Sequence, residues 1–162
     1  MKIEVVPASP EDLPAVLAIE RDSQPEPWNE ALFREELCRP HSRMLVARGH
    51  ERPNSPLGYI CFWKVADEIQ VHNVAVHRDY RRQGIGSALL QWVLRFGLAG
   101  RARVAVLEVR QNNLGAQKFY QRHGFRAVGE RPDYYAPGES AIIMELEFDQ
   151  QRRKTNESDD RA

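Results

Sequence analysis

The chain has 162 residues, no formal net charge and 42% hydrophobic residues, which predicts one globular domain. The balanced charge excludes a general preference for nucleic acid or a membrane surface, and neither is expected as a partner. Cys38 and Cys61 lie far apart without neighbours at metal-ligand spacing, so no metal is expected. No apolar run near the N-terminus is long enough for a signal peptide or a membrane span, and we expect a cytoplasmic protein.

The first part of the chain predicts a strand and two helices. A weakly alternating strand is expected over residues 3–6, and Ser9 with Pro10 then supplies a capping hydroxyl and a proline suited to the first helical turn. The next four residues at helical spacing, three of them apolar, are Leu13, Val16, Leu17 and Glu20. The proline segment 25–27 breaks this helix, and a second, short helix is capped near Asn29.

Three strands are expected in the middle of the chain. They cover residues 44–47, 57–65 and 69–76. The polar, proline-containing stretch 49–56 predicts a hairpin loop between the first two, and Ala66–Asp67 a tight turn between the second and third.

Two helices and three strands are expected in the rest of the fold. The first helix has an apolar face formed by Ile85, Ala88, Leu89, Trp92, Val93 and Phe96, and we expect Gly97 and Gly100 to close it. The apolar run 104–107 predicts a central strand covered on both faces. A helix over about 114–123 then ends at Gly124.

The last two strands are expected over 125–128 and 141–148, separated by a loop that contains Tyr134 and Tyr135. Residues after about 149 have no apolar pattern. We therefore expect one domain over 1–148 and a charged, disordered tail over 149–162. Helices can cover both faces of one mixed sheet, so the expected class is α/β, with three α/β/α layers.

A basic turn with two glycines joins the strand over 69–76 to the following helix. It consists of Arg81, Arg82, Gln83, Gly84, Ile85, Gly86 and Ser87. Glycine permits positive φ and close approach of a ligand, and the first turn of a helix has unpaired N–H groups. Together with the arginines, these groups predict a binding site for a phosphate or pyrophosphate.

The common nucleotide-binding motifs fit this turn poorly. A Walker A loop has Lys-Ser/Thr after its second glycine, whereas Gly86 is followed by Ser87 and Ala88. The dinucleotide fingerprint has a small residue where this chain has Leu89. By itself, the turn could also be an ordinary connection between strand and helix.

Two ionisable side chains follow the central apolar strand. Glu108 stands at its C-terminal end, the edge at which open α/β sheets bind ligands, and can serve as a general base. Tyr120, in the next helix, is protonated at neutral pH, as a general acid must be. The alternatives are a salt bridge between Glu108 and Arg110, and a core position for Tyr120, which composition alone favours.

The pattern Arg81-x-x-Gly84-x-Gly86 resembles the acetyl-coenzyme A signature of the GNAT acetyltransferases. The resemblance extends from about residue 3 to residue 148 and is closest to the RimI group of ribosomal-protein-alanine N-acetyltransferases. The matching segments are Pro27-Trp28-Asn29-Glu30, Asn73-Val74-Ala75-Val76, Leu107-Glu108-Val109-Arg110, Asn113, Phe119-Tyr120, Gly124-Phe125, Tyr134-Tyr135 and Ala141-Ile142-Ile143-Met144.

The resemblance implies roles for these residues. The backbone of Val74, Ala75 and Val76, on a strand splayed from its neighbour, would bind the acetyl-pantetheine arm, and the basic turn the pyrophosphate. Asn113 would also contact the cofactor, although capping of the following helix is its alternative role. Glu108 would be the base and Tyr120 the acid. Trp28, Tyr134 and Tyr135 would lie in a groove for the acceptor peptide, with packing at a loop edge as the alternative.

The resemblance also implies an acceptor, which in RimI-like enzymes is the N-terminal alanine of a small-subunit ribosomal protein. An α-amine with a pKa of about 8 is roughly 10% neutral at pH 7, whereas less than about 0.1% of a lysine with a pKa of about 10.4 is neutral. This difference modestly favours a protein N-terminus. The alternatives are an acetyltransferase for lysine or small amines, and a non-catalytic acetyl-CoA-binding domain. We expect a monomer or weak dimer.

Overall fold

The computed structural model describes residues 1–159, without the side chains of residues 150, 151, 155 and 159. It has two compact units, one formed by Met1–Lys64 and His72–Val93 and the other by Val65–Val71 and Leu94–Ala162. Seven strands follow the hydrogen-bonded order β1-β2-β3-β4-β5-β7-β6. The predicted mixed α/β fold is confirmed.

The first unit contains four strands and two helices, the first turns of a third helix and two short 3₁₀ turns. Its elements are β1 (Ile3–Pro7), η1 (Pro10–Asp12), α1 (Leu13–Ser23), α2 (Glu30–Cys38), β2 (Ser42–Gly49), most of β3 (Arg52–Val65), the second half of β4 (Glu68–Val76), η2 (Arg78–Tyr80) and the start of α3 (Ile85–Ala99). The predicted cap at Asn29 forms, because Asn29 Oδ1 accepts the Leu32 N–H at 2.9 Å. At Ser9 the hydroxyl caps no helix N–H; instead, the Asp12 carboxylate accepts the Ser9 N–H at 2.9 Å.

Strand β3 separates the two faces of this unit, because successive side chains of a strand point to opposite sides. Tyr59 belongs to the apolar cluster formed with α1 and α2. Phe62 instead contacts Trp92 of α3, with ring centroids 6.3 Å apart. Gly58 also lies beneath α3, since an added Cβ would meet Ile85 Cγ2 at 3.1 Å. The three layers expected from the sequence are therefore present here.

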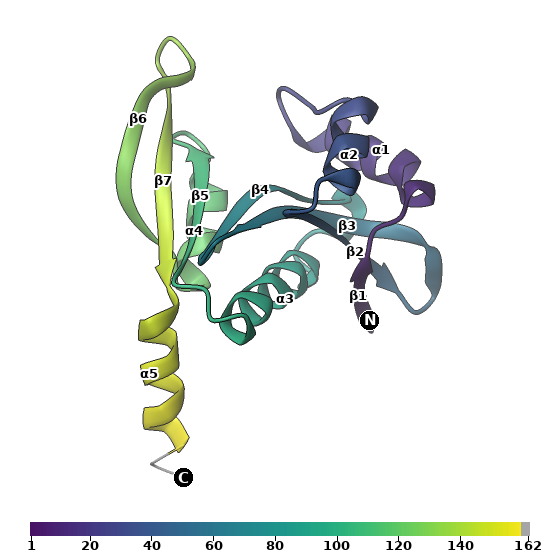
Figure 1. Cartoon of the computed structure of the whole chain (residues 1–162). Helices are drawn as coiled ribbons and strands as arrows, with labels where there is room; N and C mark the ends of the chain where they lie inside the picture. The colour runs from purple at the N-terminus through teal and green to yellow at the C-terminus, as the bar shows by residue number, and fades with distance from the viewer. Residues whose placement is uncertain (160–162) are drawn as a thin grey trace. The chain divides into compact units, whose positions relative to one another are not determined.

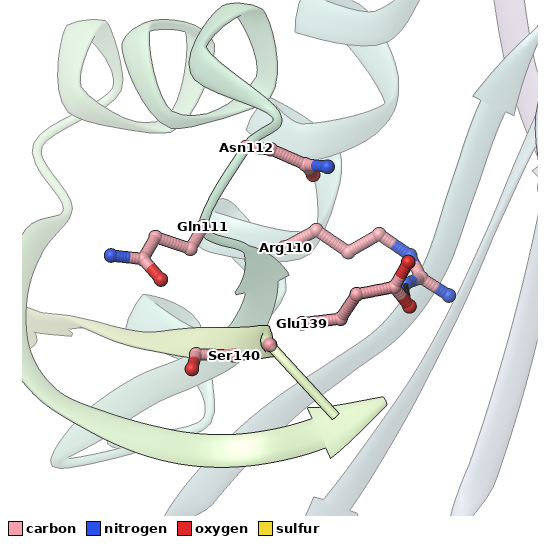
Figure 2. Close-up of a pocket in the computed structure, with 6 residues that line it drawn as sticks. Arg110, Gln111, Asn112, Glu139 and Ser140 are labelled. Atoms are coloured by element: carbon pink, nitrogen blue, oxygen red, sulfur yellow. Dashed lines mark hydrogen bonds and ion pairs between the residues drawn. The ribbon is translucent and has the colours of Figure 1, made fainter. Parts of the chain in front are cut away.

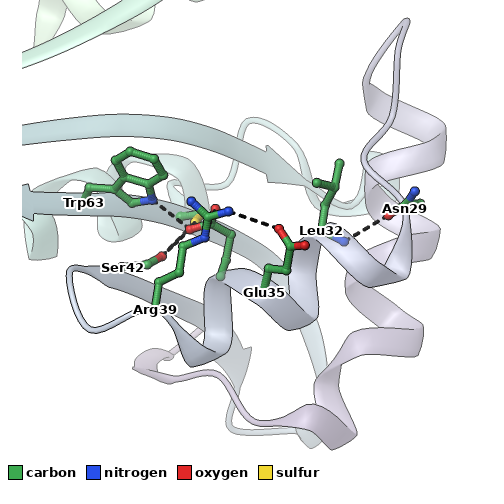
Figure 3. A network of polar contacts seen from close by, with 8 residues as sticks. Asn29, Leu32, Glu35, Arg39, Ser42 and Trp63 are labelled. Atoms are coloured by element: carbon green, nitrogen blue, oxygen red, sulfur yellow. Dashed lines mark hydrogen bonds and ion pairs between the residues drawn. The ribbon is translucent and has the colours of Figure 1, made fainter.

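A buried carboxylate fastens the end of α2 to β2 and β3. Glu36 is 8% exposed and accepts hydrogen bonds from Ser42 Oγ at 2.6 Å and Trp63 Nε1 at 2.7 Å. At the surface of the same helix, Arg39 pairs with Glu35 at 3.0 Å. Figure 3 shows these contacts together with the cap at the other end of α2. Polar contacts thus hold α2 at both ends.

The second unit contains β5 (Val104–Arg110), α4 (Leu114–Arg122), β6 (Arg126–Ala136), β7 (Glu139–Glu147) and α5 (Phe148–Asp159), with the first half of β4 and the end of α3. Strands β6 and β7 form a long antiparallel hairpin, and α5 continues directly from β7 (Figure 1). The parallel β4–β5 ladder runs from the pair Glu68–Val104 to the pair Val71–Leu107. It stops before Val74, where the splay is expected.

Two predicted loops are wrong because the strands extend through them. Strand β3 begins at Arg52, and the register between Arg48 and Gly49 jumps from Pro56 to Arg52, so the intervening residues form a bulge. Strand β6 likewise reaches Ala136, and Tyr134 and Tyr135 lie on this strand. Its irregular stretch includes Asp133, which has a φ of 56°. Polar and proline residues predicted loops, but in both places a bulge accommodates them.

Two further predictions, one about the end of α3 and one about the C-terminal segment, also need correction. Gly97 lies inside α3 rather than closing it, and its lack of a Cβ admits Phe148, whose Cζ would lie 2.6 Å from an added Cβ. The residues expected to form a disordered tail are helical in α5 as far as Asp159, and the last three residues lie outside the described part of the chain. Arg152 donates to the carbonyl of Ala102 at 3.2 Å, a tertiary contact that no local pattern indicates.

Candidate active site

The basic turn between β4 and α3 contains two residues with positive φ. Arg82 has a φ of 61° and Gly84 a φ of 83°, and alternation between left- and right-handed residues turns successive N–H groups to one side. Nothing lies within 4 Å of a Cβ built on Gly84, so the turn is open. Ile85 is 1% exposed and anchors the start of α3, while Arg82 and Gln83 are exposed. This turn can present N–H groups and a guanidinium to a phosphate.

The side chain of the neighbouring Arg81 donates hydrogen bonds to two other residues of the chain. Arg81 Nε donates to the Val76 carbonyl at 3.2 Å, and Arg81 Nη2 donates to Ser23 Oγ at the same distance. Arg81 therefore ties the end of β4 to the end of α1. In the first turn of α3, Gly86 and Ser87 are half-buried.

Strand β4 brings the predicted acyl-binding segment close to β3. Val74 and Val76 are half-buried, and Ala75 is buried in the cluster beneath α1. The Ala75 carbonyl oxygen would lie 3.0 Å from a Cβ on Gly58. The two backbones can approach this closely because β3 carries glycine at that position.

Trp28 is held at the junction of α1 and α2 by its backbone and by its ring. Its N–H donates to Glu20 Oε1 at 3.1 Å, and its ring contacts Phe33 with centroids 5.3 Å apart. The ring is partly buried against the same cluster that contains Ala75. The alternative role of Trp28, packing at a loop edge, is thus present, and its contact with an acceptor stays a prediction.

Glu108 lies in a cluster of charged and aromatic side chains in the second unit. Its carboxylate is 3.1 Å from Arg131 Nε and accepts a hydrogen bond from the Tyr134 hydroxyl. The Glu108 side chain is 27% exposed, and that of Arg131 is 55% exposed. The ion pair suggested for Glu108 thus forms with Arg131, whereas Arg110 pairs with Glu139 at 3.2 Å. The carboxylate remains open to solvent on one side.

The tyrosines around Glu108 are kept in their neutral form. The hydrogen bond to Glu108 and then its charge raise the pKa of Tyr134. Burial and then the charge of Glu108 raise the pKa of Tyr135, whose ring lies 4.0 Å from the Arg110 guanidinium carbon. Neutral phenols of this kind can donate hydrogen bonds to a carboxylate or a peptide carbonyl. The second unit thus brings three predicted site residues together.

Tyr120 occupies a core position, which was the alternative role that composition alone favoured. It is 8% exposed, and its ring contacts Phe119 and Phe125 at centroid distances of 5.3 and 5.8 Å. Burial raises the pKa of Tyr120 far above neutrality, so it carries its proton at any working pH. Asn113 acts as the helix cap of α4, with Oδ1 accepting the Ala116 N–H at 3.1 Å.

A shallow polar pocket lies beside this cluster. Its lining residues are Arg110, Gln111, Asn112, Gly138, Glu139 and Ser140 (Figure 2). The ion pair of Arg110 with Glu139 forms part of its wall. Arg110 also contacts Tyr135, so this one side chain links the wall of the pocket to the side chains that surround Glu108.

Two residues with contacts to the predicted site were not identified from the sequence. Glu20 occupies the fourth position of an otherwise apolar helical series, and a charged residue at such a position was the signal for it. Arg131 carries no periodic signal, because it stands in an irregular strand whose residues are nearly all exposed. Its pairing with Glu108 depends on the register of strands far apart in sequence.

The described part of the chain contains neither a metal-binding cluster nor a membrane-spanning helix. Among the side chains that the structure describes, no three from His, Cys, Asp or Glu lie close enough together to hold a metal ion. None of the helices in the described part of the chain is long and apolar enough to cross a membrane.

Comparison with known proteins identifies the family. Residues 13–125 match the model of the Acetyltransferase (GNAT) family. The N-alpha-acetyltransferase RimI of Mycobacterium tuberculosis is 35% identical over 124 residues, which cover 74% of this chain and 75% of that protein. The ribosomal protein bS18-alanine N-acetyltransferase of Escherichia coli (strain K12) is 31% identical over 138 residues, covering 83% of this chain and 90% of that protein.

The fold agrees with these sequence matches. The crystal structure of the ribosomal-protein-S18-alanine N-acetyltransferase from Escherichia coli superposes with a TM-score of 0.82 and 29% identity, covering 91% of this chain and 94% of that one. The chain therefore belongs to the GNAT family of acetyltransferases, in which acetyl-CoA is the acetyl donor.

Proposed function

We propose that this protein transfers the acetyl group of acetyl-CoA to the N-terminal α-amine of a protein. The observation that carries the proposal is the environment of Glu108, a partly exposed carboxylate at the end of β5 flanked by a guanidinium and two tyrosines. A positively charged amine can approach such a carboxylate from solvent, and the neutral tyrosines can bind the peptide behind it. The acceptor contacts would come from Tyr134, Tyr135 and Trp28.

In the proposed reaction, the acceptor amine first loses a proton to Glu108, directly or through water. The amine nitrogen then attacks the thioester carbonyl carbon, so that a C–N bond forms and the C–S bond breaks without an acyl-enzyme. Tyr120 gives its proton to the departing thiolate. The attacking nitrogen, which is positively charged once the C–N bond forms, releases its second proton, which restores the Tyr120 phenol directly or through water, and Glu108 gives its proton to solvent. Because burial keeps Tyr120 protonated, it is a donor across the whole pH range of the reaction.

The donor is expected to bind through backbone groups of the first unit. Residues 82–87 can hold the pyrophosphate, since the positive φ at Arg82 and Gly84 turns N–H groups outward and the turn is open. Val74, Ala75 and Val76 would bind the pantetheine arm through their backbone. Arg81 supports the turn by tying Val76 to Ser23, and Asn113 would add a contact from α4.

The acceptor we favour is the N-terminal alanine of a small-subunit ribosomal protein. The support comes from the relatives in Mycobacterium tuberculosis and Escherichia coli, named as an N-alpha-acetyltransferase and a bS18-alanine N-acetyltransferase. The pKa of an α-amine is lower than that of lysine, and this difference also favours a protein N-terminus. A larger fraction of the α-amine is already neutral at pH 7, so a single carboxylate has to deprotonate less of it.

A panel of acceptors tests this function. The full chain is incubated with acetyl-CoA and, separately, with N-terminal alanine peptides, internal-lysine peptides and polyamines, while thiol release is followed. We expect release with the alanine peptides, and mass spectrometry should place the acetyl group on the α-nitrogen. Acetylation of polyamines alone would show that the acceptor is a small amine. If none of the amines caused thiol release, the protein would not be an acetyltransferase for these substrates.

A further inference from the structure

A second carboxylate, Glu20, lies in the core of the first unit and joins three elements. It is 1% exposed, although it belongs to a helix face otherwise occupied by apolar residues. Oε1 accepts the backbone N–H of Trp28 at 3.1 Å, and Oε2 accepts the hydroxyl of Tyr59 and the Nδ2–H of Asn73 at 2.9 Å. All three of these donors are neutral groups.

A buried carboxylate of this kind is unfavourable as a core residue. Burial raises the pKa of Glu20, against the opposing effect of the hydrogen bonds from Trp28 and Asn73. An apolar side chain would fill the position at less desolvation cost, as Leu13 and Val16 do on the same face. What Glu20 supplies instead is an acceptor for three donors on separate elements.

These donors stand next to both halves of the proposed reaction site. Asn73 immediately precedes the segment Val74–Val76, and its Oδ1 accepts from Gln24 Nε2 at 3.0 Å, which ties the end of α1 to the same strand. Trp28 is a proposed acceptor contact, and Phe33, which holds its ring, packs against Tyr59 at 5.7 Å. The segment from Gln24 to Trp28 is therefore fastened to β4 at Gln24 directly through Asn73, and at Trp28 through the Glu20 carboxylate.

We propose that Glu20 is a positioning residue, which fixes the segment 24–28 on β4 so that the acceptor peptide meets an ordered surface. The inference rests on the proposed function, because the acceptor is the peptide named there. A residue that orders an acceptor-binding segment lowers the entropy lost when the acceptor binds. Its removal should therefore raise the acceptor KM and leave kcat and the acetyl-CoA KM nearly unchanged.

The test compares substitutions of two buried carboxylates in the full chain. Glu20→Met removes the acceptor of the Trp28 N–H at nearly constant volume, and Glu36→Met does the same to a carboxylate that contacts Ser42 and Trp63 instead. With an octapeptide carrying N-terminal alanine, we expect Glu20→Met to raise the acceptor KM about ten-fold, with kcat within about two-fold. Glu36→Met should change the acceptor KM by less than about two-fold.

A conservative variant and a spectroscopic signal complete the test. Glu20→Gln keeps an oxygen that can accept from Trp28 and should restore the acceptor KM to within about three-fold of wild type. The amide hydrogen of Trp28, followed by NMR, should exchange slowly in the wild type and in Glu20→Gln. In Glu20→Asp, which is too short to reach, exchange should be faster and the KM higher; this variant replaces Glu20→Met if the latter does not fold.

Three results would overturn the inference. The first is rapid exchange of the Trp28 amide in a folded variant whose acceptor KM is normal. The second is a loss confined to kcat, and the third is an equal rise in KM for Glu36→Met. A wild type that acetylates no N-terminal peptide would instead remove the proposed function, and the inference would fall with it.

Discussion

Two carboxylates, one in each unit, have opposite surroundings. Glu20 is 1% exposed and accepts hydrogen bonds from neutral groups of three elements. The Glu108 side chain is 27% exposed, and its partners are a guanidinium that is itself 55% exposed and a tyrosine hydroxyl. The first carboxylate is inaccessible to a substrate, whereas the second can exchange its partner for an incoming ammonium.

The difference indicates how burial separates a positioning role from a chemical one. A carboxylate that is enclosed by donors holds protein segments together, and its loss leaves those donors without partners. A carboxylate paired at the surface contributes little to stability, because solvent screens the pair, but it is available for proton transfer. Substitutions at the two positions should therefore affect different measurements.

The largest effect is expected from Glu108→Gln. At pH 6.5 only about 3% of an α-amine is neutral, and without the base kcat/KM should fall about 10³-fold. At pH 9 most of the amine is already neutral, so the loss should be about ten-fold. Thiol release with an N-terminal alanine peptide at the two pH values measures both numbers. Equal losses would remove Glu108 as the base.

The reverse pattern is expected for stability. Glu20→Ala should lower the free energy of unfolding by about 3 kcal/mol, because three donors lose their acceptor in the core. Glu108→Ala, the matched surface variant, should lower it by less than about 1 kcal/mol. Urea denaturation followed by circular dichroism gives both values. If the two variants lost similar amounts of unfolding free energy, the proposed difference between the buried and the partly exposed carboxylate would be wrong.

A smaller effect is expected from Arg131→Gln, which removes the resident cation from Glu108. Since an exposed ion pair is worth at most about 1 kcal/mol, the acceptor KM should fall by about three-fold when the guanidinium no longer competes with the ammonium. Arg126→Gln is the control, because Arg126 pairs with Glu147 on the same hairpin at 3.2 Å and is similarly exposed. An unchanged or higher acceptor KM in Arg131→Gln would show that the pair does not compete with the acceptor.

The smallest effect concerns the pH dependence of stability. The pKa of Glu20 is raised in the folded protein above its ordinary value of 4.5, so its protonated form is favoured by folding. Its contribution is complete below pH 4.5 and is lost as the pH rises through the folded pKa. The wild type should therefore lose stability relative to Glu20→Gln between pH 4.5 and 7.5, as measured by urea denaturation. A relative gain would show that the pKa of Glu20 is lowered instead.

Much of the fold could be predicted because its elements carry local patterns. The apolar face of α3, the cap at Asn29 and the turn at Ala66, which has a φ of 52°, are properties of neighbouring residues. Predictions failed where strand pairing overrode local composition. Arg52 pairs with Gly49, and Ala136 pairs with Glu139, so strand pairing includes residues beyond each unsuitable stretch. The residues between, Tyr134 among them, are taken up by irregular register.

The candidate site divides in the same way. The sequence by itself determined the basic turn before α3, the position of Glu108 at a strand end and the resemblance to the GNAT family, because each depends on residue types at short spacing. Tertiary structure alone decided that Glu108 pairs with Arg131 and that Glu20 accepts from Trp28, Tyr59 and Asn73. These contacts join residues far apart in the chain, and their formation depends on strand register and helix docking that no local pattern records.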